Sequence, residues 1–189
     1  INGGELGARI RLRDTEITAV RDKLDNLAGG LIVQVNTIHQ TGTDLNGNTT
    51  LNFFDPPNAT VLGATAVGTI DPDRYRGMAG VIDLSTDLVD PLNTAAALSG
   101  TGSAGDNTVA LQIAGLRNST DTVDADRDGD PTNDSAGTYE EYFNDTLTAL
   151  GRVTHTAEQD FNSRVALLEQ AKARRDSISG VSLDEEALQ

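Results

Sequence analysis

The 189-residue sequence contains no cysteine and no tryptophan, and its only aromatic residues besides histidine are four phenylalanines and three tyrosines. The lack of cysteine excludes disulfides, cysteine-based metal sites and thiol catalysis. Because aromatic residues are scarce, the core has to be built mainly from Leu, Ile, Val and Ala. An aliphatic core of this kind favours packing between helices.

Basic residues are also scarce, since 14 of them face 29 acidic residues and give a formal net charge of -15. This charge repels nucleic acid and anionic membrane surfaces, so we expect neither as a partner. No apolar run approaches the roughly 18 residues that a membrane span requires. We find no signal peptide, and we expect the sequence to be a fragment of a longer chain.

Groups for catalysis are few. The two histidines, His39 and His155, have no Ser, Cys or carboxylate at a recognisable nucleophile or metal-ligand spacing. The glycine-rich stretches match neither a phosphate-binding loop nor a dinucleotide-binding fingerprint. We therefore predict that the protein is not an enzyme.

The best-defined element is a long amphipathic helix, predicted over residues 139–179. Thr138 and Glu141 have the spacing of a capping box, and Gly180 is a suitable residue to follow the last turn. Cations near its end suit the helix dipole. Its apolar residues recur mostly at steps of three, four or seven: Phe143, Leu147, Leu150, Ala157, Phe161, Val165 and Leu168. This stripe requires a partner.

A second long helix is predicted over residues 5–41 by a near-continuous heptad pattern. One seam holds Ile10, Ile17, Leu24, Leu31 and Ile38, and the other holds Leu6, Val20 and Leu27. Two long helices at the two ends of the chain most simply pack antiparallel along each other. Arg13 and Gln34 interrupt the second seam. Because glycine inside a helix costs about 1 kcal/mol relative to alanine, we expect a bend or a close crossing at Gly29 and Gly30.

A shorter third helix is predicted over residues 107–117, with Asp106 as its cap. Residues 51–90 are rich in Pro, Gly, Val and Thr and predict small strands and loops, with strands within 60–70 and 80–84. Asn46-Gly47 is the strongest hairpin signal, and residues 91–99 suit a short helix. The predicted fold is mainly α with a small β region, a single elongated domain over residues 1–189.

An acidic loop is predicted over residues 119–137. Asp124, Asp126 and Asp128 alternate and precede Gly129, as in the first half of a calcium-binding loop. The twelfth position, which needs a glutamate in a complete loop, is Ser135, although Asp130 and Asp134 could complete an irregular site. Calcium is the one cofactor hypothesis, and a solvated acidic loop is the alternative interpretation.

Several ordered motifs carry a family resemblance. The stretches GGELGARIRLRD and VNTIHQTGTDLNGNTTLNFFD resemble the amino-terminal helical region of the bacterial flagellar hook-associated protein 1 family. RYRGMAGVIDLSTDLVDP, GDNTVAL and the tail SGVSLDEEA are similar to later segments of that family. The residues that carry the first resemblance are Gly3, Gly4, Leu6, Gly7, Asn36, His39, Gly42, Asp44, Leu45, Gly47, Phe53 and Phe54. The acidic loop is outside the family pattern.

The resemblance implies a flagellin-like core, lacking the terminal tube-forming segments, and a structural adaptor that joins hook to filament by helical self-assembly. It implies further copies of the chain, the hook protein, the second hook-associated junction protein and an export chaperone as partners. It also implies a location outside the cell, reached without a cleaved signal peptide. The alternatives are an extracellular calcium-binding interaction module, or a related flagellin or second junction protein.

Overall fold

The structure is a computed structural model that describes residues 4–100, 105–120, 123–130 and 137–179. It confirms a mainly helical chain with two long helical segments and small sheets. The chain divides into two compact units, Ile1–Leu147 and Thr148–Gln189, and the boundary falls within the longest helix. The antiparallel pairing of the two long helical segments and the single elongated domain stay predictions.

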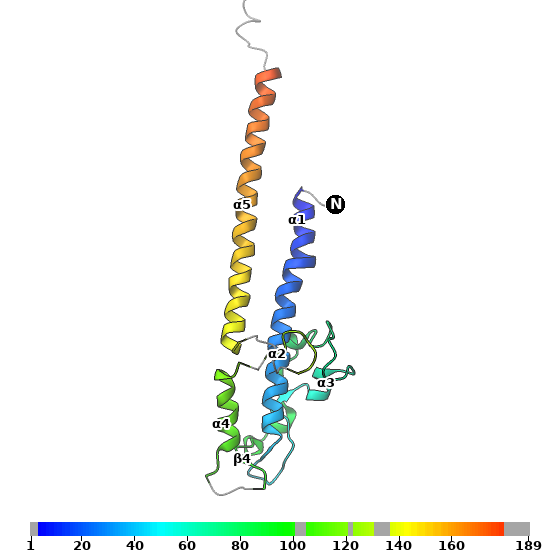
Figure 1. Ribbon diagram of the computed structural model, residues 1–189, viewed down its shortest axis with the longest axis vertical. Helices are drawn as coiled ribbons and strands as arrows, with labels where there is room; N and C mark the ends of the chain where they lie inside the picture. Colours follow the sequence, from blue (N-terminus) through cyan, green and yellow to red (C-terminus); the bar gives the residue numbers. More distant parts are fainter. Residues whose placement is uncertain (1–3, 101–104, 121–122, 131–136, 180–189) are drawn as a thin grey trace, which may run out of the picture. The chain divides into compact units, whose positions relative to one another are not determined.

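The amino-terminal helix is continuous over Gly4–His39, close to the predicted range of 5–41. It consists of α1 (Gly4–Arg11), a π-helical turn η1 (Leu12–Glu16) and α2 (Ile17–His39), as Figure 1 shows. The residues at both junctions keep right-handed helical dihedral angles, so the axis passes through without a break. A π turn inserts an extra residue, and it lies where Arg13 interrupts the second heptad seam.

The buried face of α2 is offset from the heptad seam. Its buried side chains recur at steps of three and four and include Asp25, Ala28, Ile32, Val35, Asn36 and His39. By contrast, Leu24, Leu31 and Ile38 are only half-buried, and Ile17 is exposed. The core of the first unit therefore uses a mixed polar and apolar face of α2, and the aliphatic seam lies on a neighbouring face.

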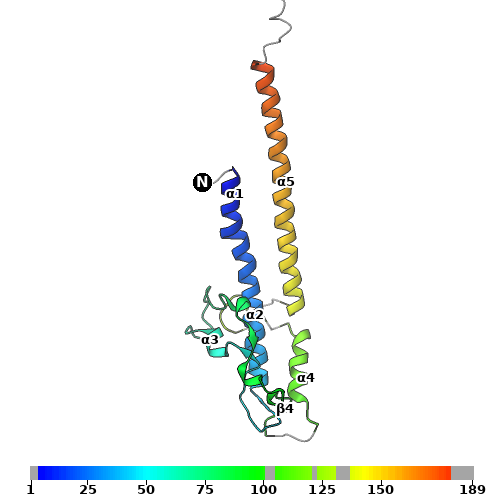
Figure 2. The ribbon, with the colours of Figure 1, turned by 180° about the vertical axis from the view of Figure 1, so that it is seen from behind.

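The core beside α2 is small. Ile32, Val61 and Tyr75 form its buried centre. Partly buried apolar side chains pack around this centre: Val33, Phe54, Leu62, Met78 and Ile82. Helix α3 (Asn58–Leu62) contributes Val61, and the turn that contains Tyr75 closes the core. Figures 1 and 2 show α3 and α4 (Thr108–Gly115) on opposite sides of α2.

Gly29 marks a close crossing, as the sequence predicts. A β-carbon at this position would lie 2.6 Å from Cγ of Tyr75, well inside van der Waals contact. Only glycine lets the tyrosine ring approach the helix backbone so closely. Gly29 therefore serves packing.

The segment between the long helices contains two two-stranded antiparallel sheets. Strand β1 (Gly42–Thr43) pairs with β4 (Ala97–Leu98), and β2 (Phe54–Asp55) pairs with β3 (Asp83–Leu84). The turn around Asn46-Gly47 forms as predicted, with an antiparallel bridge between Thr43 and Thr49. The remaining short elements are the 3-10 turns η2 (Met78–Gly80), η3 (Thr86–Leu88), η4 (Pro91–Asn93) and η5 (Leu116–Asn118).

Two local predictions in this segment are wrong. Residues 60–70 hold the end of α3 and a loop in place of a strand, because the amides of Thr60 and Val61 donate to the carbonyl of Pro57 and begin a helix. Residues 91–99 form only the turn η4 and then β4, because pairing with β1 draws the chain into an extended conformation. The first departure comes from local hydrogen bonds, and the second comes from a tertiary contact that overrides the local preference of the sequence.

The helix predicted over 107–117 is confirmed as α4 followed by η5. Asp106 accepts hydrogen bonds from the backbone N–H of Thr108, at 2.9 Å, and from that of Leu98, at 3.1 Å. These contacts lower the pKa of Asp106, with the Thr108 side chain as the largest contributor. The N-cap residue itself is Asn107, one position after the predicted Asp106, and its side chain makes no capping bond. Asp106 instead accepts from the first N–H of α4 and ties the start of the helix to β4.

The longest helix, α5, covers Tyr139–Ser179 and matches the predicted range of 139–179. Its capping box forms reciprocally: the N–H of Thr138 donates to Glu141 at 2.8 Å, and the N–H of Glu141 donates to Thr138 Oγ1 at 3.2 Å. At 1.5 Å per residue, 41 residues extend for about 60 Å. Among the described residues, no helix is long and apolar enough to cross a membrane.

Candidate functional site

The acidic loop brings three carboxylates together. Oxygen atoms of Asp124, Asp126 and Asp128 all lie within 4.8 Å of one another. Asp124 is buried, Asp126 is exposed and Asp128 is half-buried. Within the described part of the chain, this is the one cluster of at least three potential metal-ligating side chains.

Asp124 is the anchor of the loop and is only 1% exposed. Its Oδ2 accepts hydrogen bonds from the Tyr75 hydroxyl and from the backbone N–H of Gly129, the latter at 2.6 Å. Its Oδ1 accepts from the N–H of Asp128 at 3.0 Å. The buried carboxylate is therefore hydrogen-bonded through both oxygens by groups of the protein.

Burial, and then the hydrogen bond to Asp124, raise the pKa of the Tyr75 phenol far above its ordinary value. Ionising the phenol would place a second negative charge beside a buried carboxylate. The pair is thus stable with Tyr75 neutral and donating.

Backbone geometry closes the loop. Arg127 and Gly129 both adopt positive φ angles, 64° and 87°. Arg127 also reaches across to other elements, because its guanidinium donates to the carbonyls of Pro72 and Asp22. The carbonyl of Asp124 accepts from Asn26 Nδ2 of α2 at 3.5 Å. Residues 123–130 are therefore fixed onto α2, and the interpretation as a merely solvated loop does not describe Asp124.

Arg74 joins the acidic loop to the segment that follows α3. Its buried side chain donates to the carbonyls of Arg127 at 2.9 Å, Leu62 at 2.8 Å and Thr69 at 3.0 Å. Longer bonds reach Thr65 and Ala66. A planar guanidinium with five N–H groups suits this ring of carbonyls, and an ammonium group does not.

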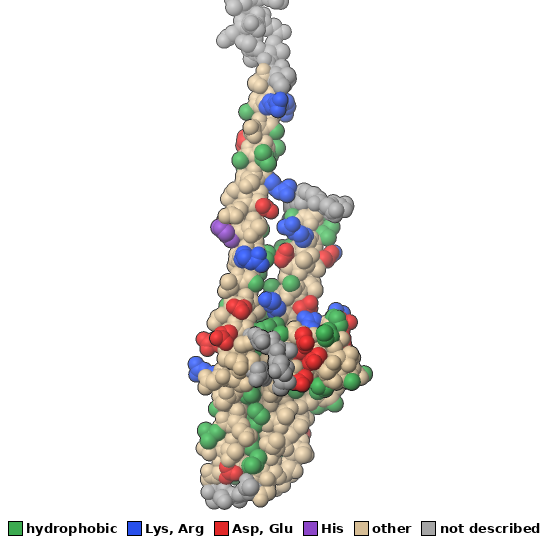
Figure 3. Space-filling model, in the orientation of Figure 1, with side chains coloured by type: hydrophobic (Ala, Val, Ile, Leu, Met, Phe, Trp, Pro, Cys, Tyr) green, Lys and Arg blue, Asp and Glu red, His purple; other side chains and the backbone are tan. Residues whose placement is uncertain are grey.

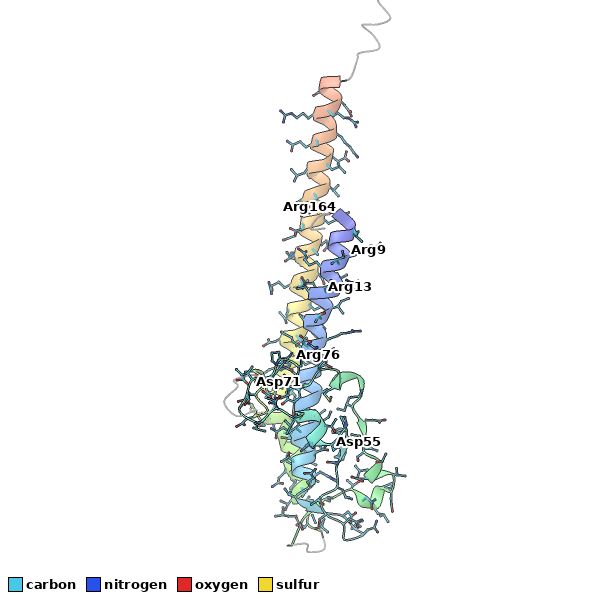
Figure 4. The ribbon with its side chains drawn as sticks, turned by 90° about the vertical axis from the view of Figure 1, so that its right-hand side faces the viewer. Arg9, Arg13, Asp55, Asp71, Arg76 and Arg164 are labelled. Atoms are coloured by element: carbon cyan, nitrogen blue, oxygen red, sulfur yellow. The ribbon has the colours of Figure 1, made fainter. Side chains whose placement is uncertain are left out.

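Two backbone bonds complete the joint. The N–H of Gly68 donates to the carbonyl of Asp128 at 2.8 Å, and the N–H of Asp71, which is labelled in Figure 4, donates to that of Arg127 at 3.0 Å. The acidic loop and residues 62–74 thus form one hydrogen-bonded assembly.

This geometry leaves the calcium hypothesis a prediction. Asp124, Asp126 and Asp128 have the ligand chemistry that calcium prefers. Asp130 lies half-buried at the end of this segment, and its N–H donates to Asp128 Oδ1 at 2.7 Å. Asp134 and Ser135, which sequence analysis considers for the rest of the site, lie outside the described residues.

A second cluster lies where α2 ends, and it contains the polar residues that carry the family resemblance. The fully buried side chain of Asn36 accepts from the N–H groups of Phe53, at 2.9 Å, and Phe54, at 2.8 Å. Its Nδ2 donates back to the carbonyl of Phe54 at 3.0 Å. One amide thus satisfies three backbone groups of the Phe-Phe segment and fixes it against α2.

His39 has the same function one turn later. Its Nε2 accepts from the N–H of Ala95 at 2.9 Å, so its Nδ1 donates to the carbonyl of Leu51 at 2.8 Å. The ring also meets Phe53 edge-on, with centroids 5.5 Å apart. Both nitrogens of this buried ring have structural partners.

Asp44 shapes the turn beyond the helix. Its Oδ1 accepts from the N–H groups of Asn46, at 2.9 Å, and Asn48, at 2.7 Å. Gly42 leaves no room for a side chain, since a β-carbon there would lie 2.7 Å from that of Ala95. These residues hold the chain in place beyond the end of α2.

Sequence analysis did not identify Arg74, Tyr75 or Asp25 as important. Asp25, on the buried face of α2, accepts from the N–H groups of Gly77, at 2.8 Å, and Ala79, at 2.9 Å. The available signal was the sequence RYRG beside glycine-rich loops, since buried loop carbonyls and amides need hydrogen-bond partners, which arginine and tyrosine side chains can provide. His155 is exposed on α5 and contacts Gln159.

The described residues thus form long helices and a compact hydrogen-bonded segment beside α2 in which buried polar residues serve packing. Residues 1–54 match the family model described as the flagellar hook-associated protein FlgK helical domain. The chain is also 26% identical over 163 residues to flagellar hook-associated protein 1 of Bacillus subtilis (strain 168). The predicted resemblance to the hook-associated protein 1 family is thereby confirmed.

The match to the Bacillus subtilis protein covers 86% of this chain and 28% of that protein. The chain thus corresponds to less than a third of its relative. No solved structure matches the chain.

Proposed function

We propose that the chain is a structural component of the bacterial flagellum, an adaptor that joins hook to filament through helical self-assembly. The observation that carries the proposal is the row of exposed apolar side chains along α5. Phe143, Leu147, Leu150, Phe161, Val165 and Leu168 are all between 41% and 65% exposed. Such a row is stabilised when a neighbouring helix covers it.

The proposal includes partners and location. The relatives' names concern the flagellar hook, so we infer that this chain contacts the hook protein, the second hook-associated junction protein and further copies of itself. An export chaperone would cover apolar surface before assembly. We infer that the protein is located in the flagellum, outside the cell, and that it is exported without a cleaved signal peptide. Its proposed role is structural, with no catalytic activity.

A matched pair of substitutions on α5 tests assembly through the apolar row. Leu168→Asp places a charge in the row, whereas Gln170→Asp places the same charge at an exposed polar position two residues away. Each variant replaces the natural protein in cells, and the subunit is quantified by mass spectrometry in purified flagella and in the medium. We expect the Leu168 variant in the medium and the Gln170 variant in flagella. Equal incorporation of both would contradict assembly through this row.

A further inference from the structure

The turn that follows α2 presents an asparagine and a glycine to solvent. Asn46 and Gly47 are both exposed, and Gly47 has a φ angle of 82°. Apart from Gly47 and its two chain neighbours, no atom lies within 4 Å of the position that a Gly47 β-carbon would occupy. The Asn46–Gly47 peptide is therefore open on its side-chain face.

We propose that Asn46 is a site of spontaneous deamidation. The backbone nitrogen of Gly47 loses its proton and attacks Cγ of Asn46. The new N–C bond closes a five-membered succinimide as the bond to Nδ2 breaks and ammonia leaves. Water then adds to one of the two ring carbonyl carbons and the bond from that carbon to the ring nitrogen breaks, which yields aspartate or isoaspartate. Glycine favours the attack because it has no β-carbon to obstruct the approach and permits the required backbone rotation.

The hydrogen bond of the attacking nitrogen is weak at this position. The N–H of Gly47 donates to the carbonyl of Asp44 at 3.3 Å, and the Asp44 carboxylate is a second acceptor close to it. Asp128–Gly129 can form the same ring and provides an internal contrast. There, the N–H of buried Gly129 donates to Asp124 Oδ2 at 2.6 Å, and the Arg74 guanidinium packs against the glycine. The structure thus protects one of these two peptides and exposes the other.

Deamidation removes a link between two segments. Nδ2 of Asn46 donates to Oδ1 of Asn93 at 2.8 Å. The Asn93 amide cannot turn over to present its NH₂ group to residue 46 without losing a hydrogen bond, because its Nδ2 donates to the carbonyl of Asp87 at 2.7 Å. Residue 46 must therefore be a donor, and a carboxylate at this position faces an oxygen.

The new charge also enters an acidic region. The sequence has no Lys or Arg between residues 77 and 116, and Asp44, Asp87 and Asp90 lie in the segments that surround the turn. Figure 3 shows no blue side chains over the lower end of the visible face. The added carboxylate repels these acidic neighbours. We infer that the modification loosens the turn from residues 91–93.

Peptide mapping by mass spectrometry tests the modification on the full chain during incubation at mildly alkaline pH. We expect Asn46 to convert at least about tenfold faster than Asn48 and Asn58, which precede residues with side chains. Asn2–Gly3, the other Asn–Gly pair of the sequence, lies outside the described residues and is resolved as a separate peptide. Equal rates at Asn46, Asn48 and Asn58 would overturn the proposal, as would conversion of Asp128 to isoaspartate before Asn46 reacts.

Two variants separate the reaction from its consequence. Asn46→Gln keeps the amide donor and slows ring closure, so the modification should disappear while Tm is retained. Asn46→Asp reproduces the product and should lower Tm by roughly 2–4 °C. An unchanged Tm for the aspartate variant would overturn the loosening of the turn. These results are independent of the proposed flagellar role.

Discussion

The phenol of Tyr75 donates a hydrogen bond to the buried carboxylate of Asp124, although 49 residues separate them in the chain. This contact joins the core of the first unit to the acidic loop. Tyr75 also packs against Gly29, so one side chain connects α2, the segment after α3 and the loop. The hydrogen bond and the packing can be tested separately.

Tyr75→Phe removes the hydroxyl and retains the ring. We expect the free energy of unfolding to fall by about 1–3 kcal/mol, because Asp124 remains buried with one donor fewer. Urea denaturation measures the change. Asp126→Asn is the control, since that exposed carboxylate should contribute little. Equal stability of the natural protein and the Tyr75 variant would contradict the anchoring role of this bond.

Gly29→Ala tests the close crossing. The added methyl group would overlap the Tyr75 ring, and overpacking of this kind costs about 1–3 kcal/mol. Gly115→Ala is the matched control in the same unit, because no atom lies within 4 Å of its β-carbon position. We expect thermal melts to show destabilisation for the first variant and none for the second. A stabilised Gly29 variant would show that the ring moves aside at no cost.

Arg74→Lys tests whether the ring of carbonyls requires a guanidinium. Lysine keeps the charge but cannot donate to all five carbonyls, so we expect a loss of about 3 kcal/mol. Arg76→Lys is the control two residues away, where the side chain is exposed and pairs only with Asp73. A similar small effect of both substitutions would contradict the role assigned to Arg74.

All three tyrosines should titrate abnormally. Burial is the largest cause that raises the pKa of each phenol, at Tyr75, Tyr139 and Tyr142. A raised pKa favours the neutral form in the folded state, whereas an unfolded chain ionises its tyrosines near pH 10. The stabilisation is therefore complete below about pH 10 and is lost as the pH rises further.

Ultraviolet absorbance should consequently show no phenolate formation near pH 10, followed by a cooperative rise that coincides with unfolding by circular dichroism. A smooth titration of folded protein near pH 10 would contradict the burial of these side chains.

The calcium hypothesis makes a separate prediction. Binding to the folded state stabilises by mass action, so millimolar calcium should raise Tm if the acidic loop holds the ion. Asp126→Asn with Asp128→Asn should remove the shift, while magnesium serves as the ionic-strength control. No shift in the natural protein would end the hypothesis, and the hydrogen bonds of Asp124 would then account for the loop alone.

The helices could be predicted from the sequence because their signals are local. Thr138 and Glu141 lie within one turn, and the apolar periodicity of α5 from Phe143 to Leu168 persists over about seven turns. Gly29 likewise predicted a bend or a close crossing, and the Tyr75 ring packs against it. The register of the buried α2 face could not be predicted, since Asp25, Asn36 and His39 are polar and the heptad pattern favoured the aliphatic face. Their partners, such as Phe54 and Gly77, lie in loops whose positions no local rule supplies.

In the acidic loop, too, the local motif could be predicted from the sequence and the tertiary contacts could not. Its alternating aspartates and Gly129 were visible as a motif, but burial of Asp124 depends on Tyr75, and the loop's attachment depends on Arg74. Both partners precede it by about fifty residues. A pattern of residue types identifies potential ligands, whereas only tertiary structure shows which oxygens the protein itself already uses.

The most direct test of the flagellar proposal is electron microscopy of cells that lack this gene. If the protein joins hook to filament, the cells should carry hooks without attached filaments and shed filament protein into the medium. Expression of the natural gene should restore filaments. Normal filaments on the deletion strain would contradict the account.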